Sequence, residues 1–174
     1  VELLMSLGAG RAASTRDYQV LSTTNITSTG SQNYTVPAGV LFLEIEMFGG
    51  GAGGGAGHHS GGRGGAQHQG GGGGGGGAYV KHKLHIPQVI EDAIVNFTVG
   101  AGGAGTATAG GINTRGTDGG NTILNIITNG GTVTDISGPI AGGGIGGRSQ
   151  GILLSSPPDF SAGGDAAGGN ITNT

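Results

Sequence analysis

Five histidines are the side chains in this sequence best suited to binding a transition metal. Three lie in one glycine-rich tract and two on the segment that follows it: His58, His59, His68, His82 and His85. A zinc site needs ligands at fixed spacing, with neighbours that orient each imidazole. The tract contains no aspartate or glutamate for that task. We therefore interpret its histidines as solvated or stacked residues at a loop tip and predict no metal site. A site on a trimer axis is the alternative.

The run from Gly100 to Gly105 matches the dinucleotide-binding pattern G-x-G-x-x-G. In such sites the third glycine opens a helix whose N-terminus holds the pyrophosphate. The residues that follow, Thr106-Ala-Thr-Ala-Gly-Gly111, do not favour a helix, and 45 glycines make a chance match expected. No phosphate-binding loop, nucleophile elbow or catalytic triad pattern occurs. We therefore predict neither a cofactor nor enzymatic activity.

Charge and hydropathy argue against two further classes of protein. The formal net charge is −3 at pH 7, whereas a nucleic-acid-binding protein typically has a basic face. One Gly-Gly-Arg-Gly-Gly element around Arg63 resembles an RNA-binding motif, but it stands alone in an acidic chain. No apolar run approaches the roughly 18 residues that a membrane-spanning helix requires. We predict no nucleic-acid partner and no membrane span.

Alternating segments predict that the chain folds into β-strands. Apolar and polar residues alternate in residues 40–48 and 78–86, as is typical of half-buried strands. These two segments flank the longest glycine tract, and their polar faces carry opposite charges, which predicts antiparallel pairing with cross-strand ion pairs. The charged residues are Glu44, Glu46, Lys81 and Lys83. Further strands are predicted from Tyr34 and at residues 95–99, 121–128 and 131–136. The last two are predicted to form a hairpin with its turn at Asn129-Gly130.

Forty-five glycines and five prolines among 174 residues fall in the range where disorder is the usual interpretation. However, the glycine tracts recur between strands, contain little serine and repeat a three-residue pattern. A polyproline-II-type helix has three residues per turn, so two glycines per turn leave bare backbone faces that can pack closely. Flexible loops are the alternative. The predicted structural glycines are Gly61, Gly62, Gly64, Gly65, Gly102, Gly103, Gly146 and Gly147.

Together these features predict an all-β fold, an antiparallel, jelly-roll-like β-sandwich with polyglycine-II-type helices packed at one end. Residues 34–174 would form this module and residues 1–33 an N-terminal arm, whose apolar start is either a turn of helix or a strand. Only 34% of the residues are hydrophobic, so the core is small and we expect a homo-oligomer, with a trimer favoured. The arm would dock on another protein through Val1, Leu3, Leu4 and Leu7.

Several motifs occur in a characteristic order. Tyr34-Thr-Val-Pro-Ala-Gly-Val40 precedes Leu43-Glu-Ile-Glu-Met-Phe-Gly-Gly-Gly51, and Phe97-Thr-Val-Gly-Ala-Gly-Gly103 precedes Gly119-Gly-Asn-Thr122. This order resembles the glycine-rich module of bacteriophage tail-fibre, receptor-binding (adhesin) and head-fibre proteins. The resemblance implies a virion appendage, often trimeric, whose loops contact host-surface receptors or glycans.

We therefore expect a non-enzymatic protein on the virion surface, with a glycine-loop tip exposed for contact with the host. The candidate contacts are the sizeable side chains of the longest tract: His58, His59, Arg63, Gln67, His68 and Gln69. One alternative is a structural capsid decoration, head-fibre or vertex protein that binds other virion proteins through its N-terminal arm. A further alternative is an ice- or surface-binding glycine-rich protein.

Overall fold

The computed structural model describes residues 3–9, 19–38, 40, 42–60, 67–85, 93–106, 115–129, 132–135, 138–148, 166–167 and 171–173. Within these ranges the fold is all-β, as the sequence predicts, and it contains no helix, so none that could cross a membrane. The strands are β1 (Leu3–Ala9), β2 (Gln19–Ile26), β3 (Gly30–Thr35), β4 (Phe42–Phe48), β5 (His58–Ser60), β6 (Gln67–Gln69), β7 (Tyr79–His85), β8 (Ile94–Val99), β9 (Thr122–Asn129), β10 (Thr132–Asp135), β11 (Ile140–Ala141), β12 (Ala166–Ala167) and β13 (Ile171–Asn173).

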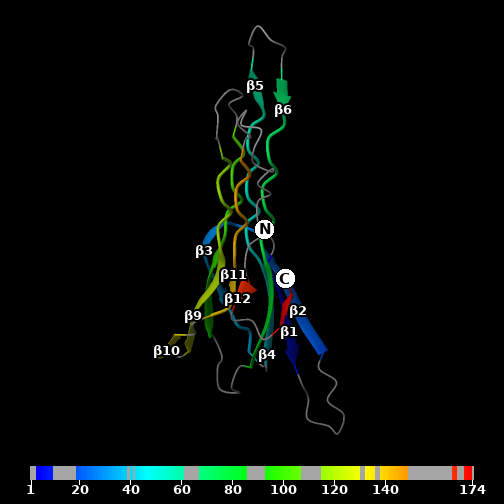
Figure 1. Cartoon of the computed structure of the whole chain (residues 1–174). Coiled ribbons are helices and arrows are strands. Elements are labelled where there is room, and N and C mark those ends of the chain that lie inside the picture. The colour runs from blue at the N-terminus through cyan, green and yellow to red at the C-terminus, as the bar shows by residue number, and fades with distance from the viewer. Residues whose placement is uncertain are drawn as a thin grey trace.

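The strands form antiparallel sheets in the lower half of the molecule as drawn (Figure 1). A five-stranded sheet has the order β13-β7-β4-β1-β2, and a six-stranded sheet has the order β12-β11-β9-β8-β3, with β10 paired to β9. Strands β5 and β6 form a separate two-stranded hairpin. Figure 1 shows this hairpin at the opposite end of the molecule from the two large sheets.

One hydrophobic core draws on both large sheets. In β4 the inward residues Leu43, Ile45 and Met47 are buried, while the alternate residues are only partly buried. Strand β8 contributes Val95, Phe97 and Val99 to the same cluster. The period of two in each strand therefore places the apolar face inward, as the sequence alternation predicts. The remaining cluster members are Val36, Val40, Val80, Ala93, Leu124 and Ala141.

Strands β4 and β7 pair antiparallel, which confirms the predicted pairing of oppositely charged faces. Glu46 lies opposite Lys81 and Glu44 opposite Lys83. The Lys81 Nζ atom is 2.6 Å from Glu44 and 3.1 Å from Glu46, so one lysine binds both carboxylates. These hydrogen bonds raise the pKa of Lys81, and the bond to Glu44 has the larger effect. Lys83 instead lies over the Phe42 ring, 4.0 Å from its centroid, a cation–π arrangement.

Two strand boundaries differ from the prediction. Strand β3 begins at Gly30 rather than at Tyr34, and it pairs with β8 along its whole length. It lies at the edge of its sheet, and its residues are mostly polar and exposed, so it lacks the apolar alternation that marks the other strands. The β9–β10 register places Thr132 opposite Asn129, one position later than a turn centred on Asn129-Gly130 requires.

The apolar N-terminal stretch forms a strand, one of the two conformations that its sequence allows. Strand β1 lies between β2 and β4 in the five-stranded sheet. Leu3 pairs with Met47 and Leu7 with Leu43 in the backbone register. The predicted boundary between residues 33 and 34 falls inside β3, and the division into arm and module stays a prediction.

Candidate functional site

Glycine-rich segments from distant parts of the chain run side by side beyond the two large sheets (Figure 1). We call residues 49–57, 70–78, 100–106, 115–121 and 142–148 the glycine bundle. Each segment directly continues a strand, since residue 49 follows β4, residue 78 precedes β7, and residues 100, 121 and 142 adjoin β8, β9 and β11. The sheets thereby set the positions of the segments, and the bundle connects the sheets to the β5–β6 hairpin.

Residues 49–57 form the centre of the glycine bundle and bond to each of the other segments. The backbone hydrogen bonds of this central segment are between 2.8 and 3.1 Å long and recur at intervals of three residues. Toward residues 70–78, the N–H groups of Gly49, Ala52 and Gly55 donate to the carbonyl oxygens of residues 78, 75 and 72, respectively. Gly50 and Gly53 donate to the carbonyl oxygens of residues 120 and 117 and accept from the N–H groups of residues 144 and 147. The carbonyl oxygens of Gly51 and Gly54 accept from the N–H groups of residues 103 and 106. Successive residues therefore face different neighbours.

The segments approach one another so closely that a side chain is excluded at every third position of residues 70–78. A Cβ atom at Gly74 would lie closer than 3.0 Å to the carbonyl oxygen of Ala52, whereas a Cβ atom at Gly73 would meet nothing within 4 Å. The positions obstructed by the central segment are Gly71, Gly74 and Gly77, and the open positions are Gly70, Gly73 and Gly76. Gly72 is obstructed from another side, by the carbonyl oxygen of Arg148. Glycine is therefore required at the first set by close backbone approach.

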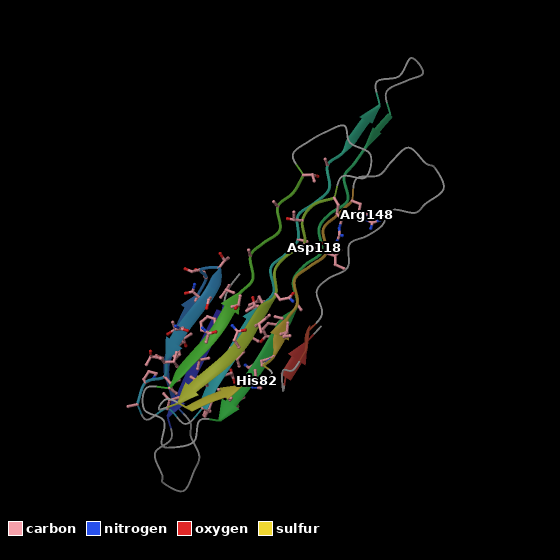
Figure 2. All side chains as sticks on the ribbon, turned by 90° about the vertical axis from the view of Figure 1, so that its left-hand side faces the viewer. His82, Asp118 and Arg148 are labelled. Carbon is pink, nitrogen blue, oxygen red and sulfur yellow. The ribbon has the colours of Figure 1, made fainter. Side chains whose placement is uncertain are left out.

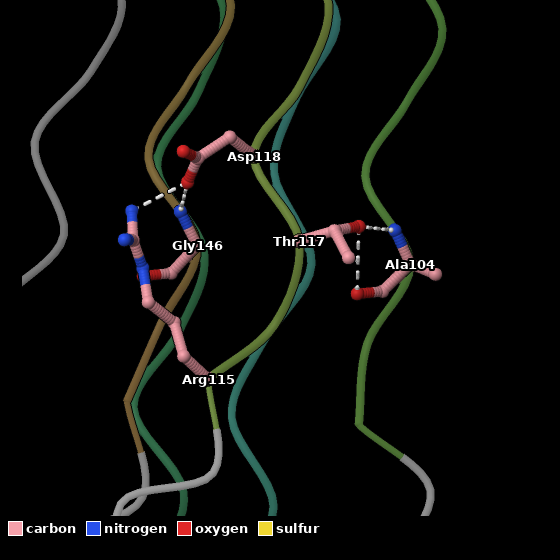
Figure 3. Close-up of polar contacts among 5 residues, drawn as sticks. All are labelled: Ala104, Arg115, Thr117, Asp118 and Gly146. Carbon is pink, nitrogen blue, oxygen red and sulfur yellow. Dashed lines mark hydrogen bonds and ion pairs between the residues drawn. The ribbon is translucent and has the colours of Figure 1, made fainter.

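Polar side chains of the bundle bind the backbone of neighbouring segments (Figure 3). The Arg115 Nε atom donates to the carbonyl oxygen of Gly146 at 3.1 Å, and the Gly146 N–H donates to Asp118 Oδ1 at 2.7 Å. Arg115 Nη2 lies 2.5 Å from the same carboxylate oxygen. Thr117 Oγ1 accepts a 2.6 Å hydrogen bond from the N–H of Ala104. These contacts join residues 115–121 to the segments on either side of them.

Thr122 lies where the bundle joins the sheets, and it is a fully buried polar residue. Its hydroxyl accepts a 3.0 Å hydrogen bond from the N–H of Gly100 and donates a 2.7 Å bond to the carbonyl of Phe48. Phe48 and Gly100 are the points at which β4 and β8 pass into the bundle. One side chain therefore holds three strand ends together.

His82 lies on β7 within the sheets, well away from the labelled Asp118 and Arg148 of the bundle (Figure 2). Its Nδ1 atom is buried and finds no hydrogen-bond partner in the part of the chain that the structure describes. Burial disfavours the charged imidazolium and lowers the pKa of His82. No group of three or more metal-ligating side chains lies together among the described residues, and the absence of a metal site stays a prediction.

The β5–β6 hairpin contains five of the six predicted contact residues. His58 pairs with Gln69 and His59 with His68 in its backbone register. Gln67 begins β6, and Arg63 lies outside the described residues. The topology thus places these residues at the end of the molecule farthest from the sheets (Figure 1).

The remaining predicted residues are divided between the bundle and the sheet. Gly102, Gly103, Gly146 and Gly147 lie in the glycine bundle, and Leu3, Leu4 and Leu7 lie in β1. The other predicted residues lie outside the described part of the chain: Val1, Gly61, Gly62, Gly64 and Gly65.

Sequence reasoning did not single out Arg115, Asp118 or Thr122. Arg115 and Asp118 each precede a glycine, whereas Thr122 lies between Asn121 and Ile123. The backbone partners of Thr122, and the Gly146 backbone that Arg115 and Asp118 contact, lie more than 20 residues away in the sequence. The three-residue spacing of Arg115 and Asp118 was the available signal for these two, and the sequence holds no comparable signal for Thr122.

The glycine-rich domain family matches the chain over residues 26–174. No curated protein and no solved structure matches it significantly.

Proposed function

The chain belongs to the glycine-rich domain family, and from this premise we propose that it is a non-enzymatic attachment protein on the surface of a bacteriophage particle. The observation that carries the proposal is the position of the β5–β6 hairpin, at the far end of a hydrogen-bonded bundle (Figure 1). Such an arrangement presents a small polar tip, including His58, His59 and His68, away from the body of the protein. The order of the sequence motifs, which resembles that of phage fibre modules, supports the virion location.

We further propose that the segments of the bundle are polyglycine-II-type helices resting on a β-sandwich. The support is the three-residue interval of the backbone hydrogen bonds, which matches a helix of three residues per turn. The single core shared by both sheets supports the sandwich. A bundle of this kind is a stiff support, because each segment is tied to its neighbours by several bonds of about 1 kcal/mol each. A trimer of such modules is the assembly that the resemblance implies.

The test is a block substitution of the tip. Alanine at His58, His59, Arg63, Gln67, His68 and Gln69 is expected to abolish competition by the purified protein for adsorption of the phage to host cells. A matched block on the exposed residues of β2, Ser22, Thr23 and Asn25, is expected to leave competition unchanged. If the tip variant competes as well as the β2 variant, and both have unchanged melting temperatures, the tip is not part of the contact surface.

The structural alternative predicts that retention on particles depends on Val1, Leu3, Leu4 and Leu7. Since β1 pairs with both β2 and β4, deleting residues 1–20 would also disturb the sheet. Particle retention of the truncated protein must therefore be compared with its thermal stability. Loss of retention at unchanged stability would favour docking through the arm over attachment through the tip.

A further inference from the structure

Strand β3 forms the least protected edge of the two large sheets. Edge strands expose a row of unpaired N–H and C=O groups, and proteins commonly shield them by shortness, a β-bulge, a proline or charged side chains. Strands β12 and β13, at two of the other sheet ends, contain two and three residues. Strand β2, at the remaining end, has a register shift where it pairs with β1. Strand β3 has six residues and pairs with β8 without a register shift.

Strand β3 also lacks the side chains that keep a sheet edge from pairing. Its sequence, Gly-Ser-Gln-Asn-Tyr-Thr, contains no charged residue and no proline. No Asp, Glu, Lys, Arg or His lies between Asp17 and Glu44. Among the described strands, none pairs with β3 on the side away from β8. Its outward backbone groups are therefore open to another strand, and no charge on β3 opposes an identical strand.

A row of asparagine side chains crosses the outer face of the six-stranded sheet and ends at β3. Asn125 Nδ2 on β9 donates to Asn96 Oδ1 on β8 at 3.0 Å, and Asn96 Nδ2 donates to Asn33 Oδ1 on β3 at 2.7 Å. Both amides thus donate toward the β3 edge. The Asn33 Nδ2 atom is the last donor of the row, and no acceptor for it lies in the part of the chain that the structure describes. The exposed Asn33 amide therefore extends the row to the sheet edge.

We propose that β3 of a second copy of this chain pairs antiparallel with β3, so that the six-stranded sheets of the two copies join. In this pair Asn33 lies opposite Asn33 of the second copy, and Ser31 lies opposite Thr35. This register keeps each residue on its own face of the sheet, because side chains alternate with a period of two. Each Asn33 Nδ2 atom then donates to Asn33 Oδ1 of the other copy, since an amide oxygen has a second lone pair beside the one bonded to Asn96. Identical amide side chains form such ladders between paired strands.

The pairing also determines how the two molecules lie. Gly30 pairs with Val99, and Val99 leads into the glycine bundle, so β3 begins beside the bundle and runs away from it. Antiparallel β3 strands therefore direct the two glycine bundles in opposite directions, with one β5–β6 hairpin at each end of the dimer. This two-fold pair differs from the trimer that the sequence resemblance implies, and it does not rest on the proposed attachment function.

Sedimentation equilibrium of the purified chain tests the association. The unaltered protein is expected to form dimers as its concentration rises. Asn33→Lys places like charges directly opposite each other in the joined sheet and is expected to weaken dimerisation at least about tenfold. Thr23→Lys, at an exposed position of the β2 edge, is the matched control and is expected to dimerise as the unaltered protein does. The melting temperatures of both variants show whether each is folded.

A second measurement leaves Asn33 in place and tests the register. The chain has no cysteine, so Ser31→Cys and Thr35→Cys each introduce a single thiol. Residue 31 lies opposite residue 35 of the second copy in the proposed pair. Under mild oxidation, a mixture of the two variants is therefore expected to form the mixed disulfide-linked dimer in preference to a dimer of either variant with itself.

Dimers that Asn33→Lys weakens and Thr23→Lys does not, together with the mixed disulfide, support the proposal. A chain that stays monomeric up to about 1 mM overturns it and leaves the edge to a segment of a different protein. Trimers, or dimers on which the two lysine substitutions have the same effect, also overturn it. If Asn33→Lys does not fold, the disulfide decides, and a mixture that cross-links no better than the single variants overturns the proposal. None of these results changes the adsorption assay on the tip block, so the two proposals fail independently.

Discussion

Replacing Gly74 with alanine adds one methyl group where the glycine bundle has no room for it. The new Cβ atom would lie closer than 3.0 Å to the carbonyl oxygens of Ala52 and Gly53. Both obstructing groups are backbone, so neither can rotate away as a side chain would. The Ala52 N–H also donates a 2.9 Å hydrogen bond to Gly75 beside this contact. Separating the two segments to admit the methyl group therefore lengthens or breaks that bond.

The cost follows from three effects. Overpacking of this kind destabilises by about 1–3 kcal/mol, and the disturbed hydrogen bond adds about 1 kcal/mol. Alanine restricts the unfolded chain and returns about 0.4–1 kcal/mol. We expect a net loss of about 2 kcal/mol in the free energy of unfolding. For a domain of this size, this corresponds to a melting temperature lower by about 4–8 °C.

Gly73→Ala is the matched control, because a Cβ atom at Gly73 meets nothing within 4 Å. It benefits from the same restriction of the unfolded chain, so its melting temperature is expected to be unchanged or slightly raised. Scanning calorimetry and urea unfolding of the purified proteins measure both variants. Equal stability of Gly74→Ala and Gly73→Ala would refute close packing of residues 70–78 against the central segment.

Three further changes test other contacts. Thr122→Val leaves the buried N–H of Gly100 and the carbonyl of Phe48 unpaired, so it is expected to cost about 2 kcal/mol or more in urea unfolding, whereas Thr122→Ser keeps both bonds and costs less. Lys81→Met removes both ion pairs and leaves Glu44 and Glu46 to repel each other. Because all three side chains are partly exposed, we expect the free energy of unfolding to fall by about 0.5–1 kcal/mol, and by less in high salt. Because burial lowers the pKa of His82, the unfolded state binds its proton more tightly, and stability declines as the pH falls below about 6.5. Replacing His82 with leucine is expected to flatten this part of the curve of melting temperature against pH, and an unchanged slope would contradict the assignment.

The sequence predicted those parts of the fold that depend on local alternation. Residues 40–48 and 78–86 were recognisable as paired strands because burial on one face and charge on the other leave a period of two, and the structure has β4 and β7 there. Strand β3 left no such signal. Its residues lie at a sheet edge and are mostly exposed, and it is held by backbone bonds and by contacts such as that from Asn96 Nδ2 to Asn33 Oδ1 at 2.7 Å.

The sequence indicated that the glycine segments pack together, but not how they are arranged in the glycine bundle. Triplet spacing indicated packed segments, yet it did not show which segments are neighbours. That choice is made by long-range backbone bonds, such as the one from Gly50 to Gly120, and glycine has no side chain to mark a partner. For the same reason the backbone bridge between Arg115 and Arg148 was not foreseen, since these residues meet only after the bundle has formed.

Amide hydrogen exchange tests the central claim, that the glycine tracts form an ordered, hydrogen-bonded support for the tip. The amides of Gly53, Gly72 and Gly144 donate backbone hydrogen bonds, and we expect them to exchange at least about a hundredfold more slowly than an unstructured chain. The amides of Gly51 and Gly73 have no acceptor among the described residues and are expected to exchange rapidly. Alternation of slow and fast exchange along the tracts is the predicted result. Uniformly fast exchange at all five glycines would contradict the account and identify the tracts as flexible linkers.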